Sequence, residues 1–146
     1  MEIWFREYSV EETNRRGENT MLSHLGIRIT EIGPDFIEGQ MPVDARTRQP
    51  LGLLHGGASV ALAESLASTA GNLTIDPDTF YCVGLEINAN HISSCKDGMV
   101  TGVAKPLHLG RTTQVWETTI RQGDRLVCVS RMTLAIIHKE KQARAD

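Results

Sequence analysis

The chain has 146 residues, of which 40% are hydrophobic and 23% charged, and its formal net charge is −3. This length and composition are typical of one globular domain, residues 1–146, with a single hydrophobic core. A negative net charge without a stripe of Lys and Arg argues against a nucleic-acid-binding protein. No stretch approaches the ~18 apolar residues of a membrane span, and no signal-peptide pattern is visible, so we expect no membrane partner and a cytoplasmic location.

The first third of the chain is expected to form two short helices followed by a β-hairpin. Ser9 is a good N-cap for the first helix, and Gly26 follows the second. Apolar and polar side chains then alternate with the period of a half-buried strand. The expected ranges are a helix from Val10 to about Arg16, a helical turn over 20–25, and strands over 27–32 and 36–43.

The middle of the chain is a glycine-rich loop, residues 49–57, that runs into one long helix ending near residue 73. This helix consists mainly of small apolar residues, as expected of a helix that a sheet approaches from several sides. It nevertheless carries one carboxylate, Glu64, near its middle. A buried carboxylate is costly unless it has a partner or a function, so Glu64 is the main candidate for chemistry.

The second half of the chain favours four strands separated by short turn-like segments, which predicts that successive strands are antiparallel neighbours. Six strands and one long helix define an α+β domain whose antiparallel sheet wraps around a central helix. Three cysteines without Cys-x-x-Cys spacing are expected to be small buried or half-buried residues in a reducing compartment. The predicted strands cover 81–94, 99–109, 112–122 and 126–138, and the charged tail 139–146 is expected to be frayed.

Alternation in the strand over 81–94 suggests one apolar row, provided that no bulge interrupts it. The residues sharing that face would be Tyr81, Val83, Leu85, Ile87, Ala89 and His91. His91 would then end the row and point toward the helix.

Gly56 and Gly57 lie where the loop becomes the helix. The first N–H groups of a helix lack internal acceptors, and glycine lets a ligand approach them, so this point offers a site for an oxyanion or a carbonyl. Gln49 and His55 flank the loop and can donate hydrogen bonds to a carbonyl or position a water. The alternatives are a glycine pair retained for packing and a structural histidine.

Glu64 lies eight residues beyond Gly56, which corresponds to ~12 Å along a helix axis. One chain therefore does not bring both groups to the same reacting atom. If they act together, they come from two copies of the chain with antiparallel helices, which predicts a homodimer. Ser68, one helical turn after Glu64, can hold the carboxylate or a water, or is simply a small residue tolerated there.

The segment 105–112 combines a proline, a glycine and two positive charges at a strand end. It can hold a phosphate-bearing ligand, or it is a plain strand–turn–strand connection.

Taken together, Gln-Pro-x-Gly-x-x-His-Gly-Gly at 49–57, the helix with Glu64, and the segments 84–91 and 106–111 resemble the hotdog-fold acyl-CoA thioesterases. The resemblance is strongest to the PaaI-like branch with the Arthrobacter-type 4-hydroxybenzoyl-CoA thioesterases and the 1,4-dihydroxy-2-naphthoyl-CoA thioesterases of bacterial menaquinone synthesis. It extends from about residue 1 to residue 137.

The resemblance implies an acyl-CoA substrate, and Glu64 as nucleophile or as general base toward water. Gly56 would polarise the thioester carbonyl with its N–H, Gln49 and His55 would assist, and Ser68 would support the carboxylate. The family usually forms a dimer of dimers with sites between subunits. Because coenzyme A thiolate leaves readily, no metal or cofactor is expected. The substrate contacts implied are Gly84, His91, Ile92, Ser93, Ser94, His108, Leu109, Gly110, Arg111, Thr112 and Thr113.

Two other functions compete with hydrolysis. One is a non-catalytic module that binds acyl-CoA. The presence of Glu64 and the absence of a DNA-binding segment argue against this function. The other is a hotdog dehydratase or hydratase, which usually needs a catalytic histidine with an acid elsewhere. The acyl group is left open between aryl and medium-chain, and its pocket is expected on the apolar helix face, with Val60 and Leu62 among the lining residues.

Overall fold

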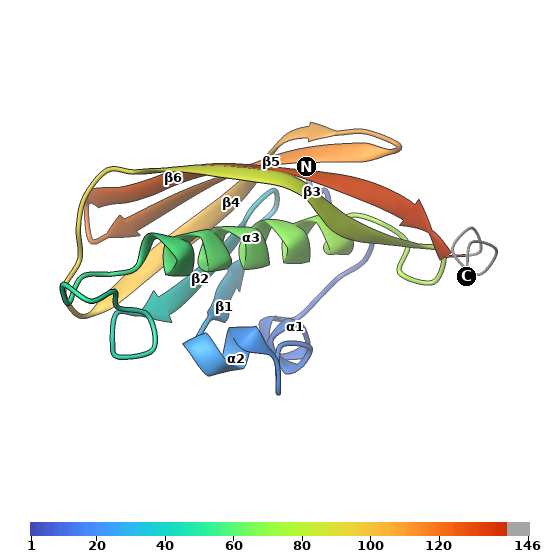
Figure 1. Cartoon of the computed structure of the whole chain (residues 1–146). Coiled ribbons are helices and arrows are strands. Elements are labelled where there is room, and N and C mark those ends of the chain that lie inside the picture. Colours follow the sequence, from blue (N-terminus) through green and yellow to red (C-terminus); the bar gives the residue numbers. More distant parts are fainter. Residues whose placement is uncertain (140–146) are drawn as a thin grey trace.

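The computed structural model describes residues 1–139, and the predicted frayed tail lies outside them beyond Lys139. One antiparallel sheet curls around one long helix, which confirms the α+β architecture (Figure 1). The helices are α1 (Val10–Arg15), α2 (Met21–Leu25) and α3 (Gly56–Leu73), and the strands are β1 (Arg28–Ile32), β2 (Ile37–Pro42), β3 (Phe80–His91), β4 (Met99–Leu109), β5 (Thr113–Gln122) and β6 (Arg125–His138).

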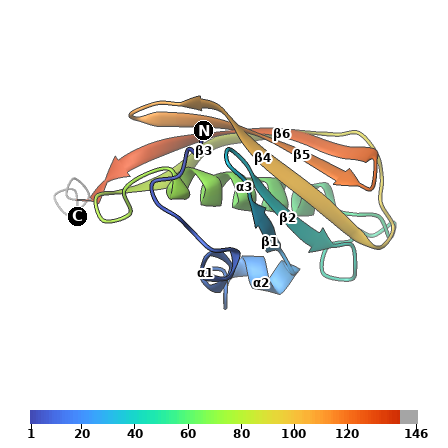
Figure 2. The same ribbon diagram turned by 180° about the vertical axis from the view of Figure 1, so that it is seen from behind.

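The sheet has the strand order β1-β2-β4-β5-β6-β3, and α3 contacts β2 through β6. Both views show α3 between the sheet and a small layer made of α1 and α2 (Figures 1 and 2). The capping signals act as predicted, because Ser9 Oγ accepts the Glu12 N–H at 3.0 Å and Gly26 ends α2 with a φ of 73°. The face of α3 that meets the sheet carries the core, and the opposite face is turned toward α1 and α2.

β3 does not pair with the strand that follows it, so the expectation that these two strands are neighbours is wrong. β3 pairs with β6, whereas β4 lies between β2 and β5. The connecting segment 92–98 is held by the loops around it, since Cys95 O accepts from Leu54 N and Gly98 O accepts from Val43 N. It therefore spans the end of the sheet instead of forming a tight turn, and β3 forms an edge of the sheet.

A β-bulge interrupts the alternation in β3. The register with β6 shifts between Gly84 and Glu86, which leaves Leu85 as the extra residue. Val83 before the bulge and Leu85 within it are 40% and 61% exposed, whereas Ile87 after the bulge packs against the core. The single apolar row predicted for this strand is wrong, because the bulge exchanges the two faces.

α3 approaches the sheet closely where β2 pairs with β4. Gly39 and Gly102 lie opposite each other in that ladder. A Cβ atom on Gly39 would lie 2.6 Å from Leu66 Cδ2, and one on Gly102 would lie 2.7 Å from Leu66 Cδ1. The two glycines thus provide the space that the buried Leu66 side chain fills, and they set the distance between helix and sheet.

A buried polar chain ties β5 to the C-terminal end of α3. Trp116 Nε1 donates to Gln114 Oε1, and Gln114 Nε2 donates to Thr74 Oγ1, both at 2.8 Å. Thr74 Oγ1 in turn donates to Gly71 O at 2.8 Å. Each of these three polar side chains, Trp116, Gln114 and Thr74, therefore has a hydrogen-bond partner, as a buried polar network requires.

The three cysteines, Cys82, Cys95 and Cys128, are buried and have free thiols, as the sequence predicted. Burial raises the pKa of the Cys82 thiol to about 11. These thiols are therefore protonated near neutral pH and serve as small apolar side chains.

Candidate active site

The N-terminal end of α3 presents one backbone donor without an acceptor. His55 is the N-cap, and its Nδ1 accepts the N–H of Gly57 at 2.8 Å, while its carbonyl accepts from Ala58 and Ser59. Within residues 1–139, nothing accepts the N–H of Gly56. The helix end thus retains a free N–H with the positive end of the helix dipole behind it.

The hydrogen bond to Nδ1 also defines the state of the His55 ring. A neutral imidazole that accepts at Nδ1 carries its proton on Nε2, which is then a donor. The side chain is exposed at the mouth of the loop. His55 therefore has both the structural role considered as an alternative and a remaining N–H that can face a ligand.

His91 lies against the start of α3. A Cβ atom on Gly56 would be 2.7 Å from His91 Nε2, so only glycine allows the imidazole to reach this position. A cavity of about 330 Å³ opens at this point. Its lining includes Gln49, Gly56, His91, Ile92, Ser93 and Ser94, so the structure brings together six of the residues predicted for the site.

Gln49 is partly used by its own loop, because its side-chain oxygen accepts from Leu51 N. Its backbone N–H donates to Leu53 O, and its carbonyl accepts from Gly52 N, which closes a tight turn. Gly52 has a φ of 79°, a conformation that glycine adopts without strain. The amide NH₂ of Gln49 stays available for a ligand in the cavity.

Glu64 lies in the middle of α3, half-buried, and its carboxylate points at β3. A Cβ atom on Gly84 would be 3.0 Å from Glu64 Oε1, so the glycine makes room for the acid. Within the described residues, the carboxylate has no hydrogen bond and no ion pair. A half-buried carboxylate without a partner among residues 1–139 is an unusual and costly arrangement.

Glu64 and Gly56 are on one continuous helix, and Glu64 does not line the cavity beside Gly56. The rise of an α-helix keeps them ~12 Å apart along the axis, as the sequence predicted. A single chain therefore holds two separate half-sites, one made of backbone donors and the other of a carboxylate.

A second cavity, of about 470 Å³, lies beyond Glu64 along the same helix face. It is lined by Ser68, Thr69 and Asn72 of α3 and by Tyr81 of β3, among others. Among these residues, Ser68 was predicted to belong to the site, and Thr69 was expected only to flank its surface. Polar residues recurring at three- and four-residue intervals after Glu64 marked this face, but the helices that close the cavity gave no such signal.

Of the two residues expected to line the acyl pocket, Leu62 is not accessible in the single chain, whereas Val60 is partly exposed. Leu62 is fully buried in the core, and neither residue lines the cavity beside Gly56 or the cavity beyond Glu64. The apolar face of α3 is buried against the sheet. The open space lies instead on its more polar face.

The turn between β4 and β5 projects away from both half-sites (Figure 1). It is closed by a hydrogen bond from Gly110 N to Thr113 O at 2.9 Å, and a bulge at Leu107 precedes it. Lys105 lies 5.5 Å from the ring centre of Phe36, whereas Arg111 is exposed. The structure does not join the predicted contacts at 108–113 to the other site residues of the same chain.

No group of three or more potential metal-ligating side chains comes together in residues 1–139. No helix in that part of the chain is long and apolar enough to cross a bilayer.

Known proteins resemble this chain in sequence and in fold. The family model described as "Thioesterase superfamily" matches residues 51–129. The chain is 53% identical over 136 residues to the 1,4-dihydroxy-2-naphthoyl-CoA hydrolase of Escherichia coli K12, which covers 92% of this chain and 99% of the relative. It is 51% identical over 137 residues to a proofreading thioesterase of Cronobacter sakazakii, at 92% and 98% coverage. A solved thioesterase from Haemophilus influenzae has a TM-score of 0.90 and 48% identity, and covers 93% of this chain and 95% of its own.

Proposed function

Because this chain belongs to the thioesterase superfamily, with its hotdog fold and acyl-CoA thioesterase activity, we propose that it cleaves an aryl-CoA thioester in a site shared by two copies of the chain. The specific candidate is 1,4-dihydroxy-2-naphthoyl-CoA, the substrate named for the relative in Escherichia coli K12. The free acid would then serve menaquinone synthesis. The buried free thiols suit a reducing compartment such as the cytoplasm.

The observation that carries this proposal is the unpartnered carboxylate of Glu64. A half-buried acid without a partner among the described residues, with Gly84 leaving room in front of it, is positioned for proton transfer or for attack. As a base, Glu64 takes a proton from a water whose oxygen bonds to the thioester carbon. The C–S bond then breaks, and the departing thiolate receives the proton.

Glu64 can instead attack the carbon directly, which forms a mixed anhydride that water later cleaves. A single turnover in ¹⁸O-labelled water distinguishes the two routes. Label in the Glu64 carboxylate shows direct attack with water adding at the Glu64 carboxyl carbon, whereas label confined to the product acid fits the base role or an anhydride that water cleaves at the acyl carbon.

The free N–H of Gly56 is suited to the negative charge that develops on the carbonyl oxygen. His55 Nε2–H and the amide of Gln49 are close enough in the fold to assist, since one caps the helix and the other lines the adjoining cavity. No metal or cofactor is required in this scheme, because a coenzyme A thiolate is a good leaving group. Ser68, one turn beyond Glu64, would hold the attacking water.

The donors and the carboxylate meet only if a second chain contributes. The outer edge of β3 lacks a neighbouring strand, and the side chains of Val83 and Leu85 are exposed beside it. Antiparallel pairing of two β3 edges around a two-fold axis would set the two α3 helices antiparallel. Gly56 of one copy would then face Glu64 of the other, and two such dimers would form the expected tetramer.

The exposed turn His108–Thr113 would bind the coenzyme A portion, because Arg111 offers a free guanidinium for a phosphate and Gly110 an approachable backbone.

The primary test measures thiol release from a panel of aryl, hydroxynaphthoyl and aliphatic CoA thioesters. We expect the highest kcat/KM for the aryl compounds and no turnover with Glu64→Ala. Binding of the same thioesters without any thiol release by the unaltered protein would identify a binding module instead. Hydration or dehydration of an enoyl thioester would identify the dehydratase alternative.

The shared site is tested by mixing two inactive variants, Glu64→Ala and Gly56→Leu. In a hybrid dimer, one site contains both substitutions and the other site contains neither. Partial activity should therefore return. Subunit exchange shown by mass spectrometry, without recovery of activity, would exclude a site made from two chains.

A further inference from the structure

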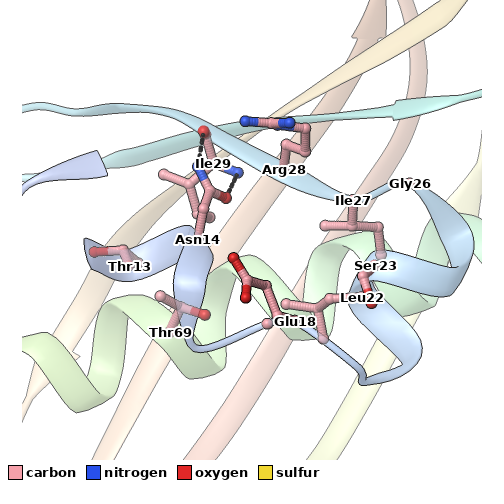
Figure 3. A pocket seen from close by; sticks show the side chains of 11 residues that line it. Thr13, Asn14, Glu18, Leu22, Ser23, Gly26, Ile27, Arg28, Ile29 and Thr69 are labelled. Carbon is pink, nitrogen blue, oxygen red and sulfur yellow. Dashed lines mark hydrogen bonds between the residues drawn. The ribbon is translucent and has the colours of Figure 1, made fainter. Parts of the chain in front are cut away.

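Two hollows of the structure each have a volume of about 330 Å³, and they differ in how their polar groups are used. One lies under α1 and α2 (Figure 3). There Asn14 is held by two hydrogen bonds of 2.8 Å to the backbone of Ile29, and Glu18 and Ser23 are open to solvent. Thr13, the buried polar residue of its lining, donates to a backbone carbonyl one helical turn earlier. The polar groups of this hollow therefore do not depend on a ligand.

The other hollow is the cavity beside Gly56, and its polar groups are unpaired. The N–H of Gly56 has no acceptor within residues 1–139. Ser59, one helical turn later, lines the cavity although only 2% of its surface is exposed, and its hydroxyl makes no hydrogen bond in the same part of the chain. The imidazole of His91 makes none there either. Three polar groups with free hydrogen-bonding capacity around one cavity indicate a polar ligand.

The His91 ring directs its Nε2 vertex at Gly56. A Cβ atom on Gly56 would lie 2.7 Å from Nε2, 3.0 Å from Cε1 and 3.2 Å from Cδ2, and the last two are the ring carbons bonded to Nε2. Since a Cβ atom lies ~2.5 Å from the nitrogen of its own residue, Nε2 and the Gly56 nitrogen are within ~5 Å of each other. Two donors that hold one oxygen at ~2.9 Å each lie at most ~6 Å apart. The distance therefore allows one oxygen to accept from both groups.

The backbone around His91 is fixed by β6. His91 ends β3 opposite Cys128, and the next two residues, Ile92 and Ser93, both donate to Val127 O, at 2.8 and 3.3 Å. The imidazole therefore starts from a fixed point at the end of a paired strand. Donors held in advance in this way are the kind that stabilise an oxyanion.

His55 is less well placed for the same oxygen. Its Nδ1 accepts the N–H of Gly57 at 2.8 Å, and the residue does not line the cavity beside Gly56. His91 does line that cavity. Of the two histidines at the start of α3, His91 is thus the one that shares a space with the free N–H.

We propose that His91 is a catalytic residue, whose Nε2–H and the N–H of Gly56 together hold the thioester carbonyl oxygen while it is negatively charged. When an oxygen of water or of Glu64 bonds to the carbonyl carbon, the π electron pair of the C=O bond moves onto this oxygen. The pair returns as the C–S bond breaks and the thiolate leaves. The proton stays on His91 throughout, so a neutral imidazole is sufficient. This role rests on the proposed thioesterase function and adds to it a second donor for the oxyanion.

Substitutions that place an N–H at different points test the role. A Gln side chain can bring its amide nitrogen near the position of Nε2, whereas an Asn side chain is one bond too short. His91→Leu and His91→Asn should lower kcat about 100-fold, as for one lost oxyanion donor, with KM nearly unchanged. His91→Gln should keep kcat within about 5-fold, because it retains a donor. His24→Leu, at an exposed position on α2, is the control and should change neither quantity.

A truncated substrate separates this role from a contact with the nucleotide of coenzyme A. The N-acetylcysteamine thioester of the same acid keeps the carbonyl and the sulfur and lacks the nucleotide. His91→Leu should lower kcat by the same factor with the truncated and the complete thioester, because the donor acts at the carbonyl. A loss confined to KM, or one that disappears with the truncated thioester, would overturn the proposal.

Gly56→Ala tests the pairing of the two groups, because it keeps the backbone N–H and adds the Cβ that collides with the ring. The exposed imidazole can swing out to solvent, so the variant should fold, as thermal unfolding will verify. Its kcat should fall about as far as that of His91→Leu. In a His91→Ala background the same change should cost less than about 3-fold, since no ring is left to displace. Equal losses in both backgrounds would overturn the pairing and the proposal with it.

The outcomes separate this inference from the function on which it rests. Full turnover by His91→Leu would overturn the role of His91 and leave the thioesterase intact. Absence of thiol release from every thioester with the unaltered protein would overturn both.

Discussion

The two faces of α3 differ in polarity and in packing. The face toward the sheet carries Leu62, Leu66 and small residues, all buried, and it approaches β2 and β4 through a pair of glycines. The opposite face carries Glu64, Ser68 and other polar groups, and it borders cavities in place of packed side chains. The difference shows that one helix can place stability on one side and chemistry on the other, so substitutions on the two faces should give different phenotypes.

The largest effect is expected at Glu64, on the open face. Glu64→Gln keeps the size of the side chain and removes the carboxylate, so kcat/KM should fall about 100- to 10,000-fold, the usual range for a lost general base. Free thiol release measures the rate, and thermal unfolding should show no loss of stability. Ser65→Ala, the adjacent position, is the control and should leave both quantities nearly unchanged. A Glu64→Gln protein with ordinary turnover would contradict the assignment of chemistry to this face.

The second effect is expected at Leu66, on the packed face. Leu66→Ala removes a fully buried side chain from the space above the two glycines. The resulting cavity should lower the free energy of unfolding by about 2–5 kcal/mol, as measured by urea denaturation. A loss below about 1 kcal/mol would mean that the helix and the sheet collapse onto the cavity, and the two faces would then be less distinct than proposed.

A third, smaller effect tests the polar chain at the C-terminal end of α3. Gln114→Leu leaves the indole N–H of Trp116 without an acceptor and Thr74 Oγ1 without its donor. The cost should be about 1–3 kcal/mol in urea denaturation. The control Gln40→Leu, at a partly exposed position on β2, should cost much less. Equal losses in the two variants would show that the buried hydrogen bonds contribute little.

The smallest effect is expected far from both faces, at the exposed pair Asp44–Arg46. Hydrogen bonding to the Arg46 side chain holds the pKa of Asp44 at about 2. Because the folded pKa lies below the ordinary value of 3.8, the pair stabilises the fold above about pH 3.8, and this contribution is lost as the pH falls through about 2. An NMR titration of the Asp44 carboxyl should give this midpoint and should return it toward the ordinary value in Arg46→Ala. An unchanged midpoint in that variant would show that Arg46 does not lower the pKa of Asp44.

Local patterns predicted most of the architecture. The strand over 99–109 was predicted with the bounds that β4 has, and Ser9 and Gly26 act as the caps that their chemistry favours. These features depend on neighbouring residues, which is why the sequence was sufficient. The position of β3 and its bulge at Leu85 depend on pairing with β6, about fifty residues later in the chain, and no local signal specifies that choice.

For the candidate site, too, the sequence predicted the features that depend on local geometry but not those that depend on tertiary packing. The separation of Gly56 from Glu64 follows from helix geometry alone, whereas the cap made by His55 was not predicted. The cavities did not follow, because they depend on how α1 and α2 lie over Thr69 and Gly17. An apolar pocket at Leu62 was the natural prediction from hydrophobicity, yet the sheet had already covered that residue.

The fixed spacing of Gly56 and Glu64 along α3 has a consequence for mass action. If each working site needs the start of one helix and the middle of another, the active species is an association product, and its amount follows the dimer dissociation constant. At concentrations well below that constant, the hydrolysis rate should fall with the square of the chain concentration. Dilution alone would then abolish the hydrolytic activity of chains that remain fully folded.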